Sequence, residues 1–273
     1  MSAASAHSPV VLVGCGNMGR AILDGWLAAG AMAPEAIRVV DPFASELPQG
    51  VRRSDGLAGA LEGIAPSAIV LAVKPQQVEE VAESFAGSGQ SGEVLLLSIL
   101  AGVETVRLAT LFPGTRVVRF MSNLAAAFGA APVGAFPGGE LPRRAQALAE
   151  ALLAPLGDLT WLANEDQFHA FTALAGSGPG FVYRFLAALQ AGGEALGFAP
   201  EEAARLALTT VRGAVELAGR SPDDFAGLAA RVASKGGTTA AGYAVLDADH
   251  ALDRLIAATL RAAAERSAEM ARA

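Results

Sequence analysis

The sequence has very little cysteine. Cys15 is the only one in 273 residues, so the disulfide framework that holds small secreted proteins together is excluded. A lone thiol suits a reducing compartment, and the opening MSAASAHSPVV lacks the basic start of a secretory signal. We therefore expect a cytoplasmic protein in which residues 1–9 form a disordered tail.

The sequence also lacks a cluster of basic residues. It carries 27 acidic residues against 20 lysines and arginines, a formal net charge of −7, and the two signs are interspersed. The basic surface typical of nucleic-acid-binding proteins is therefore missing, and we expect no nucleic-acid partner. A small anionic substrate is still compatible with this charge, because local backbone dipoles can outweigh net charge.

A continuous membrane-spanning run is missing as well. Residues 120–139 carry no charge, but two prolines, four glycines, Ser122 and Asn123 interrupt them. A lipid-exposed helix is therefore not expected. The three histidines have no metal-ligand spacing, so we expect no metal site.

Apolar residues make up 52% of the chain, and in its first half they form short runs separated by helical patterns. This alternation is typical of a doubly wound, mostly parallel sheet. We predict such a Rossmann-type α/β domain over residues 10–163. Its strands are expected at 10–14, 37–41, 68–73, 93–99 and 116–121, with the segments around Val133 and Leu159 extending the sheet and flanking a helix that starts after Pro142.

After about Asn164 the sequence shows no convincing strand, and Ala, Leu, Glu and Arg dominate. Pro200 opens one predicted helix, with two glutamates in its first turn. The apolar arc of this helix, which includes Leu208 and Val215, is broader than a surface helix needs. We predict an all-α dimerisation domain over residues 164–273, present as a homodimer or an assembly of dimers. A helical bundle without a partner is the alternative.

Three glycines follow the first predicted strand in VVLVGCGNMGRAI, spaced as G-x-G-x-x-G. Where this spacing joins a strand to a helix, it is typical of dinucleotide binding. Gly14 would form the tight turn, Gly16 would let the pyrophosphate approach the backbone, and Gly19 would pack the helix on the strand. The helix N-terminus would then bind the phosphates.

Asp41 ends the second predicted strand, roughly 20 residues after these glycines, where an acid usually binds the adenosine ribose hydroxyls and disfavours a 2′-phosphate. The nearest arginines downstream are Arg52 and Arg53, which could reach the adenine edge. We therefore predict NAD(P)H as the cofactor, with a preference for NADH. The alternative for Asp41 is a turn residue before Pro42.

The stretch LAVKPQ ends the third predicted strand with Lys74 and Pro75. At the carboxyl end of a central strand, this turn would border the nicotinamide half of the site. Lys74 is then expected near the cofactor ribose or phosphate. The alternative is a solvated lysine before a proline.

Five stretches follow one another along the chain: GCGNMGRAI, LAVKPQ, RFMSN, GSGPGFV and VASKGGTTAAGYAVLD. In this order and spacing the sequence resembles the pyrroline-5-carboxylate reductase family. The resemblance covers nearly the whole chain after the first nine residues, and the last stretch is the most distinctive. The glycine fingerprint alone is shared by many oxidoreductases.

The resemblance implies an enzyme that transfers hydride from NAD(P)H to the C=N bond of 1-pyrroline-5-carboxylate and forms L-proline. It also implies a substrate site at a dimer interface, beside the nicotinamide. The matching cofactor positions are Gly14, Gly16, Asn17, Met18, Gly19, Asp41, Ala72, Val73, Lys74 and Pro75. The matching substrate positions are Asn123, Ser234, Gly236, Gly237, Thr238 and Thr239, of which Ser234 and Thr239 are the candidate catalytic residues.

A few positions depart from the family pattern. Ser122 and Leu124 stand where a proline and a threonine are usual, Gly180 stands for an alanine, and Lys235 replaces a proline of the last loop. Because three of these lie close to the expected site, a related imine or β-hydroxyacid reductase is the alternative enzyme. A non-catalytic dinucleotide-binding dimer is the alternative from another class.

The loop VASKGGTT also has a physical interpretation. Its two glycines let backbone amides converge, and Thr238 and Thr239 precede a helical segment, which together make an anion-binding site. The anion would be the substrate carboxylate, fixed so that the ring carbon faces the nicotinamide. No dedicated general acid stands out: the imine nitrogen enters protonated, or takes its proton through Thr239 or water.

Overall fold

A computed structural model describes residues 9–88 and 94–272 of the chain. The chain divides into two compact units, one of Met1–Gly176 with Ala263–Ala273 and one of Ser177–Ala262. The predicted tail lies outside the described residues except for Pro9, and so does Glu93, where one strand was expected to begin. The functional boundary predicted between residues 163 and 164 stays a prediction.

The first unit is built on one eight-stranded sheet of order β3-β2-β1-β4-β5-β6-β7-β8. Neighbouring strands are parallel except for β6 and β7, which are antiparallel. The predicted doubly wound, mostly parallel sheet is confirmed. The strands are β1 Val10–Val13, β2 Ile37–Val40, β3 Arg52–Ser54, β4 Ala68–Leu71, β5 Leu95–Ser98, β6 Arg116–Met121, β7 Ala131–Pro137 and β8 Gly157–Trp161.

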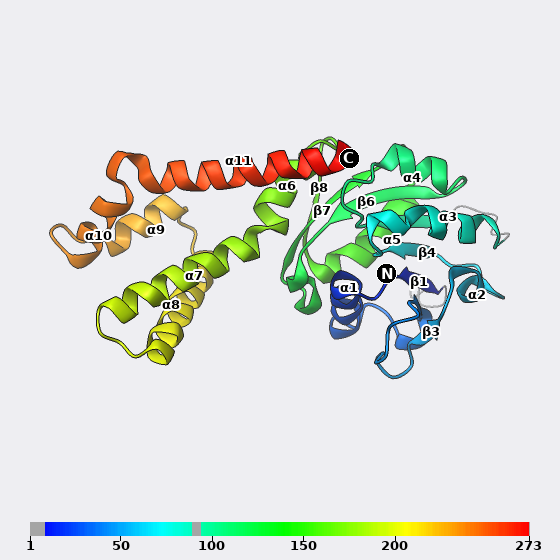
Figure 1. The fold of residues 1–273 in the computed structure, drawn as a ribbon, viewed down its shortest axis with the longest axis horizontal. Coiled ribbons are helices and arrows are strands. Elements are labelled where there is room, and N and C mark those ends of the chain that lie inside the picture. Colours follow the sequence, from blue (N-terminus) through cyan, green and yellow to red (C-terminus); the bar gives the residue numbers. More distant parts are fainter. Residues whose placement is uncertain (1–8, 89–93, 273) are drawn as a thin grey trace. The chain divides into compact units, whose positions relative to one another are not determined.

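Helices cover both faces of this sheet (Figure 1). On one face α1 (Asn17–Ala28) and α5 (Arg143–Leu153) pack in one apolar cluster, and on the other α2 (Leu57–Leu61), α3 (Val78–Ala86) and α4 (Thr105–Leu111) pack in a second. Residues of β1 belong alternately to the first and to the second cluster, because successive side chains of a strand point to opposite faces. Short 3₁₀ helices lie in the connections between these elements: η1 Pro34–Ala36, η2 Pro75–Gln77, η3 Leu124–Phe128 and η4 Ala154–Leu156.

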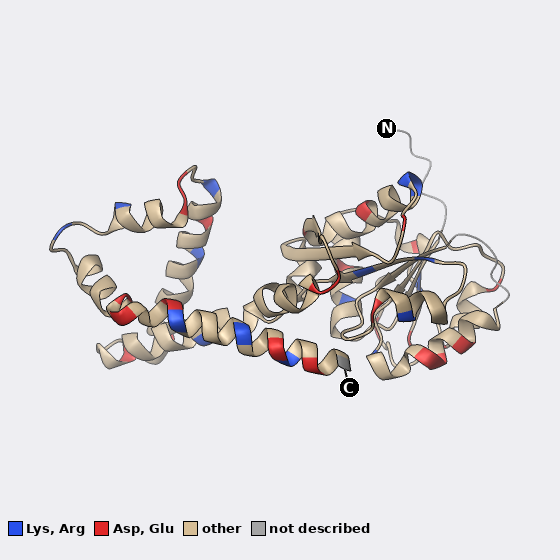
Figure 2. Cartoon of the chain, turned by 90° about the horizontal axis from the view of Figure 1, so that it is seen from above, with Lys and Arg blue, Asp and Glu red and all other residues tan. Residues whose placement is uncertain are grey.

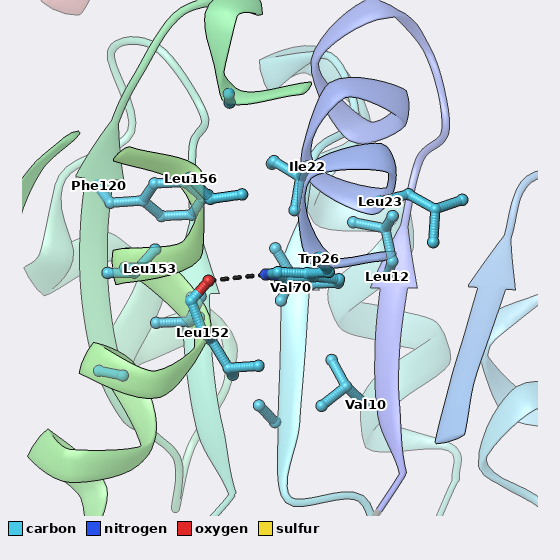
Figure 3. Packing of buried hydrophobic residues seen from close by; sticks show 14 of the residues in the cluster. Val10, Leu12, Ile22, Leu23, Trp26, Val70, Phe120, Leu152, Leu153 and Leu156 are labelled. Carbon is cyan, nitrogen blue, oxygen red and sulfur yellow. Dashed lines mark hydrogen bonds between the residues drawn. The ribbon is translucent and has the colours of Figure 1, made fainter. Parts of the chain in front are cut away.

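Trp26 lies at the centre of the first cluster, fully buried. Its indole Nε1–H donates to the carbonyl of Leu152, 2.7 Å away, as Figure 3 shows. A buried indole needs such a partner, because an unsatisfied N–H in the core is destabilising. This bond fixes α1, and with it the glycine-rich turn that precedes α1, against the end of α5.

The first unit ends in a short helix α6 (Gln167–Phe171) that continues as one π-helical turn, Thr172–Gly176. The second unit then contains α7 (Gly178–Ala195), α8 (Pro200–Arg220), α9 (Phe225–Val232), α10 (Thr238–Leu246) and the turn η6 (Ala248–His250). The last helix, α11 (Ala251–Arg272), begins in the second unit and its end from Ala263 belongs to the first. Between residues 164 and 272 no residue is in a strand, so the predicted all-α character of this part of the chain is confirmed.

Acidic and basic side chains both occur along the helices of each unit (Figure 2). In α8 they follow the helix dipole, with Glu201 and Glu202 in the first turn and Arg220 in the last. Among the residues that the structure describes, no helix is both long and apolar enough to cross a membrane.

Candidate functional site

The turn between β1 and α1 requires glycine at two of its three motif positions. Gly14 has a positive φ of 93°, and a Cβ there would come within 2.6 Å of the Ala72 carbonyl oxygen. A Cβ on Gly19 would overlap the carbonyl of Gly14. These two glycines therefore serve the fold, by making the turn and by letting α1 approach the strands closely.

Gly16 differs from the other two glycines of the motif, Gly14 and Gly19. Its φ of −67° and ψ of −165° are open to any residue, and a Cβ there would meet nothing within 4 Å. It is the N-cap residue of α1 and makes no side-chain cap, so the first amides of the helix are left for another acceptor. Asn17 is exposed and Met18 half-buried beside it. The free space over Gly16 fits a pyrophosphate that sits against the backbone.

Asp41 follows β2 and is bonded to the glycine turn. One carboxylate oxygen accepts from the Cys15 amide at 2.7 Å, and the other accepts from the Phe43 amide at 2.8 Å. Asp41 is half-buried, and a carboxylate has lone pairs left for further donors such as ribose hydroxyls. Burial, and then the negative charge of Asp41, raise the pKa of the Cys15 thiol, so this cysteine stays protonated and unreactive.

The stretch after β4 lies beside the glycine turn. The Ala72 amide donates to the Val13 carbonyl at 2.7 Å, which continues the β1–β4 pairing past the strand ends. Val73 and Pro75 are half-buried, whereas the Lys74 side chain is exposed. The structure thus gathers all ten predicted cofactor positions at the carboxyl ends of β1, β2 and β4, the edge where open α/β sheets bind ligands.

Asn123 follows β6, and its amide group is already bonded within the first unit. Its Nδ2 donates to the Ala175 carbonyl at 2.8 Å, and its Oδ1 accepts from the Ala125 amide at 2.9 Å. The side chain is 8% exposed. It anchors the π-helical turn to the end of β6, and its predicted role in substrate binding stays a prediction.

A buried charged cluster was missed by the sequence analysis. Arg119 in β6 is 4% exposed, donates from Nη1 to Glu165 Oε1 at 2.8 Å, and lies over the Phe168 ring at 4.5 Å. Glu165 also accepts from the amide and the hydroxyl of Thr105, at 2.9 and 2.7 Å. The cluster ties the start of α4 to α6. The available signal was an arginine inside an apolar strand pattern, which needs a buried partner.

The loop before α10 belongs to the second unit. Gly236 has a positive φ of 74°, and Gly237 is the N-cap residue of α10 without a side-chain cap. The Gly237 amide donates to the Ser234 carbonyl at 2.9 Å, so the turn itself uses this donor. Ser234 and Thr238 are exposed and Thr239 is half-buried. The first amides of α10, from Thr238 onward, are therefore the donors available to an anion.

The two histidines that the structure describes each have a side-chain partner. His169 Nδ1 lies 3.0 Å from Ser267 Oγ, and the exposed His250 lies 3.6 Å from Asp253. Within residues 9–88 and 94–272 no group of three or more His, Cys, Asp or Glu side chains could hold a metal ion.

Comparison with known proteins agrees with this geometry. Residues 165–270 match the family profile "Pyrroline-5-carboxylate reductase dimerisation", and residues 9–102 match "NADP oxidoreductase coenzyme F420-dependent". The chain is 34% identical over 272 residues to the pyrroline-5-carboxylate reductase of Haemophilus influenzae, covering 97% of this chain and 98% of that one.

Solved structures give the same picture. A pyrroline-5-carboxylate reductase from Coxiella burnetii superimposes with a TM-score of 0.85 at 31% identity, covering 96% of this chain and 98% of that one. The Plasmodium falciparum pyrroline carboxylate reductase with NADP bound has a TM-score of 0.82 at 23% identity, covering 97% and 99%. At that identity the second likeness concerns the fold alone.

Proposed function

The chain belongs to the pyrroline-5-carboxylate reductase family, and from this premise we propose that it reduces the C=N bond of 1-pyrroline-5-carboxylate to give L-proline. The single observation that carries the proposal is the full-length match to curated reductases of this name at 34% identity. The free space over the Gly16 backbone fits the pyrophosphate of the dinucleotide cofactor that such a reaction needs.

The bound nicotinamide dinucleotide supplies the hydride, and the chain's own residues position the reactants. In the first unit, the backbone around Gly16 and the first turn of α1 hold the pyrophosphate, and Asp41 holds the adenosine ribose. Ala72, Val73, Lys74 and Pro75 border the nicotinamide half. Positioning of the two reactants is most of what a hydride transfer requires from the protein.

The loop Ser234–Thr239 holds the substrate carboxylate. Its donors are the first amides of α10 and the hydroxyls of Thr238 and Thr239. The N-terminus of α10 has no side-chain cap, so these amides and the positive end of the helix dipole are available to the anion. The Gly237 amide is bonded to the Ser234 carbonyl and is not free to donate to the substrate. The role of Gly237 is therefore to leave room in the turn, because it has no side chain. Ser234 and Thr239 remain the candidate catalytic residues, and the imine nitrogen enters protonated or takes its proton through Thr239 or water.

We propose a preference for NADH over NADPH. Asp41 follows β2, the position at which an acid usually binds the ribose hydroxyls and disfavours a 2′-phosphate, since like charges repel. Two nearby arginines are already bonded to other groups: Arg20 to Asp24 and the Glu46 carbonyl, and Arg53 to Asp55 and the Ala44 carbonyl.

A homodimer or an assembly of dimers is the proposed active form, in the cytoplasm. Among the described residues, most of the large apolar side chains that are exposed lie in the second unit, including Leu208, Val215 and Phe225. On α8, only Ala203 and Ala207 are buried within the chain. A second copy would cover the rest of this apolar arc.

Steady-state oxidation of NADH with 1-pyrroline-5-carboxylate, against a panel of other cyclic imines and β-hydroxyacids, tests the proposal. We expect the highest kcat/KM for 1-pyrroline-5-carboxylate and proline as the product. A higher kcat/KM for another imine or a hydroxyacid would identify a related reductase. Cofactor binding without turnover of any substrate would identify a non-catalytic dinucleotide-binding dimer.

A further inference from the structure

Phe43 has the largest exposed fraction among the large hydrophobic side chains that the structure describes, at 90%. It stands two residues after Asp41, in the loop that follows β2. An aromatic side chain buries a large area when it finds a partner, so one held almost entirely in water is a notable feature of this unit.

The loop that carries Phe43 is fixed by side chains on three sides. The Phe43 amide donates to Asp41 Oδ1 at 2.8 Å. Arg53 donates to the carbonyl of Ala44 at 3.1 Å, and Arg20 donates to the carbonyl of Glu46 at 2.9 Å. Salt bridges to Asp55 and Asp24 hold these two guanidinium groups in turn. The ring is therefore presented on a braced backbone, which lowers the entropy lost when a ligand binds.

Asp41 connects this loop to the dinucleotide site. One of its carboxylate oxygens bonds to the Phe43 amide and the other bonds to the Cys15 amide in the glycine turn. If Asp41 binds the adenosine ribose, the base attached to that ribose lies at the same edge of the sheet, beside the loop. A flat ring beside an exposed phenyl face gives a stacking contact, which every purine can make.

We propose that Phe43 is an adenine-binding residue whose ring stacks on the base of the dinucleotide. The inference rests on the dinucleotide site proposed above and adds an affinity determinant at its adenosine end. The stacking contact requires no hydrogen bond to the edge of the base, since it is made through the π face. The contact would act equally on NADH and NADPH, in contrast to Asp41, which discriminates between them.

The test divides the cofactor into its two halves. Phe43→Ala is compared with wild type, with Phe43→Tyr as the conservative variant and with Phe128→Ala as a control for loss of another exposed phenylalanine of this unit, 74% exposed. Dissociation constants are measured by fluorescence or calorimetric titration for NADH, for ADP-ribose, which has the adenosine half, and for reduced nicotinamide mononucleotide, which lacks it.

We expect Phe43→Ala to weaken NADH and ADP-ribose by a similar factor of about fivefold or more, as loss of one base–aromatic stack does. Reduced nicotinamide mononucleotide should bind unchanged, and Phe43→Tyr and Phe128→Ala should bind NADH as wild type does. Unchanged NADH affinity in Phe43→Ala would overturn the inference, and so would an equal loss for the mononucleotide. A change of oligomeric state with unchanged NADH affinity would instead make Phe43 a contact between copies.

Failure of the proposed function gives a different result. If the wild-type protein does not reduce 1-pyrroline-5-carboxylate, the titrations with NADH and ADP-ribose still report on Phe43. The stacking inference and the proposed reaction therefore fail independently.

Discussion

At the scale of single residues, Gly14, Gly16 and Gly19 are spaced as one motif, yet the structure surrounds them differently. Backbone atoms crowd Gly14 and Gly19, whereas the space over Gly16 is empty and its φ and ψ are open to other residues. Two of the glycines are therefore required by the fold, and we attribute the third to a ligand.

Gly16→Val should separate binding from folding. The added side chain occupies the space assigned to the pyrophosphate, so NADH affinity should fall by at least about tenfold, while the free energy of unfolding falls by no more than about 1 kcal/mol, the usual loss for a poor N-cap residue. Gly19→Ala, by contrast, forces overlap with the Gly14 carbonyl and should destabilise by about 1–3 kcal/mol. Fluorescence titration and urea unfolding measure the two effects. Unimpaired NADH binding by Gly16→Val would place the cofactor elsewhere.

Asp41 should set the choice between cofactors. We expect a higher kcat/KM with NADH than with NADPH, because the carboxylate repels a 2′-phosphate. Asp41→Ser should narrow or reverse this preference. Asp41→Asn is the matched control, since it removes the charge but keeps an oxygen that can accept from the Cys15 or Phe43 amide. Steady-state kinetics with both cofactors decide the point, and a native preference of about tenfold or more for NADPH would refute it.

At the scale of elements, the loop before α10 combines a positive-φ glycine with an uncapped helix N-terminus. Gly237 sits so close to Ser234 that a Cβ there would overlap the serine hydroxyl. Both features keep side chains away from the first amides of α10. We therefore expect this loop to bind a small anion, and we expect substitutions in it to affect substrate binding and not cofactor binding.

Substitutions in this loop should act on substrate and leave cofactor binding intact. Thr239→Ala removes a hydroxyl whose hydrogen bond to a charged group is worth roughly 1.5–3 kcal/mol, so kcat/KM for 1-pyrroline-5-carboxylate should fall by about tenfold or more. Gly237→Val should lower it further by displacing Ser234. NADH titration of both variants should match wild type. Full activity in Thr239→Ala, or loss of NADH binding in both, would remove the loop from the substrate site.

The elements that the sequence predicted correctly have strong periodic or motif signals. The apolar runs of β1, β2, β4, β5 and β6, the glycine turn and the Ala-rich helices all lie where they were expected. The edge strand β3 was missed because Arg-Arg-Ser carries no apolar pattern, and pairing with β2 alone makes it a strand. The apolar pattern around Arg119 indicates that this arginine needs a buried partner, but Glu165 is far away in sequence, so the local pattern could not identify it.

The sequence also predicted which residues would gather at one edge of the sheet. The glycine turn was predictable because a strand–turn–helix with fixed glycine spacing carries its own geometry, and the binding of the cofactor by these residues stays a prediction. It did not reveal that Asp41 bonds to Cys15 and Phe43, or that Asn123 bonds to Ala175. Such contacts depend on how the carboxyl ends of separate strands come together, which only the assembled sheet determines.

At the scale of the whole molecule, the second unit leaves apolar surface that one chain does not cover. Leu208 is 56% exposed and Val215 is 66% exposed along α8, within the arc that the sequence predicted to be buried. Full-length relatives confirm the predicted reductase family, and the profile over residues 165–270 describes a dimerisation region. A second chain is the partner that this surface fits.

The protein should therefore sediment as a dimer or a larger assembly at micromolar concentration. Val215→Asp places a charge in the exposed apolar arc and should shift the protein toward monomer, because an unpaired carboxylate is costly to bury. Glu216→Ala, which changes the neighbouring exposed residue, is the matched control and should sediment as wild type. A well-folded wild-type monomer under these conditions would count decisively against the proposed assembly.

The proposed reaction is a direct transfer of hydride from C4 of the nicotinamide to the C=N carbon of 1-pyrroline-5-carboxylate. The most direct measurement uses NADH with deuterium on the reactive face of its C4 position and follows the product by NMR and mass spectrometry. We expect L-proline with one deuterium at Cδ, the former imine carbon, because a hydride that passes directly from carbon to carbon does not exchange with water. Absence of proline, or proline without deuterium at Cδ from either face of labelled NADH, would contradict it.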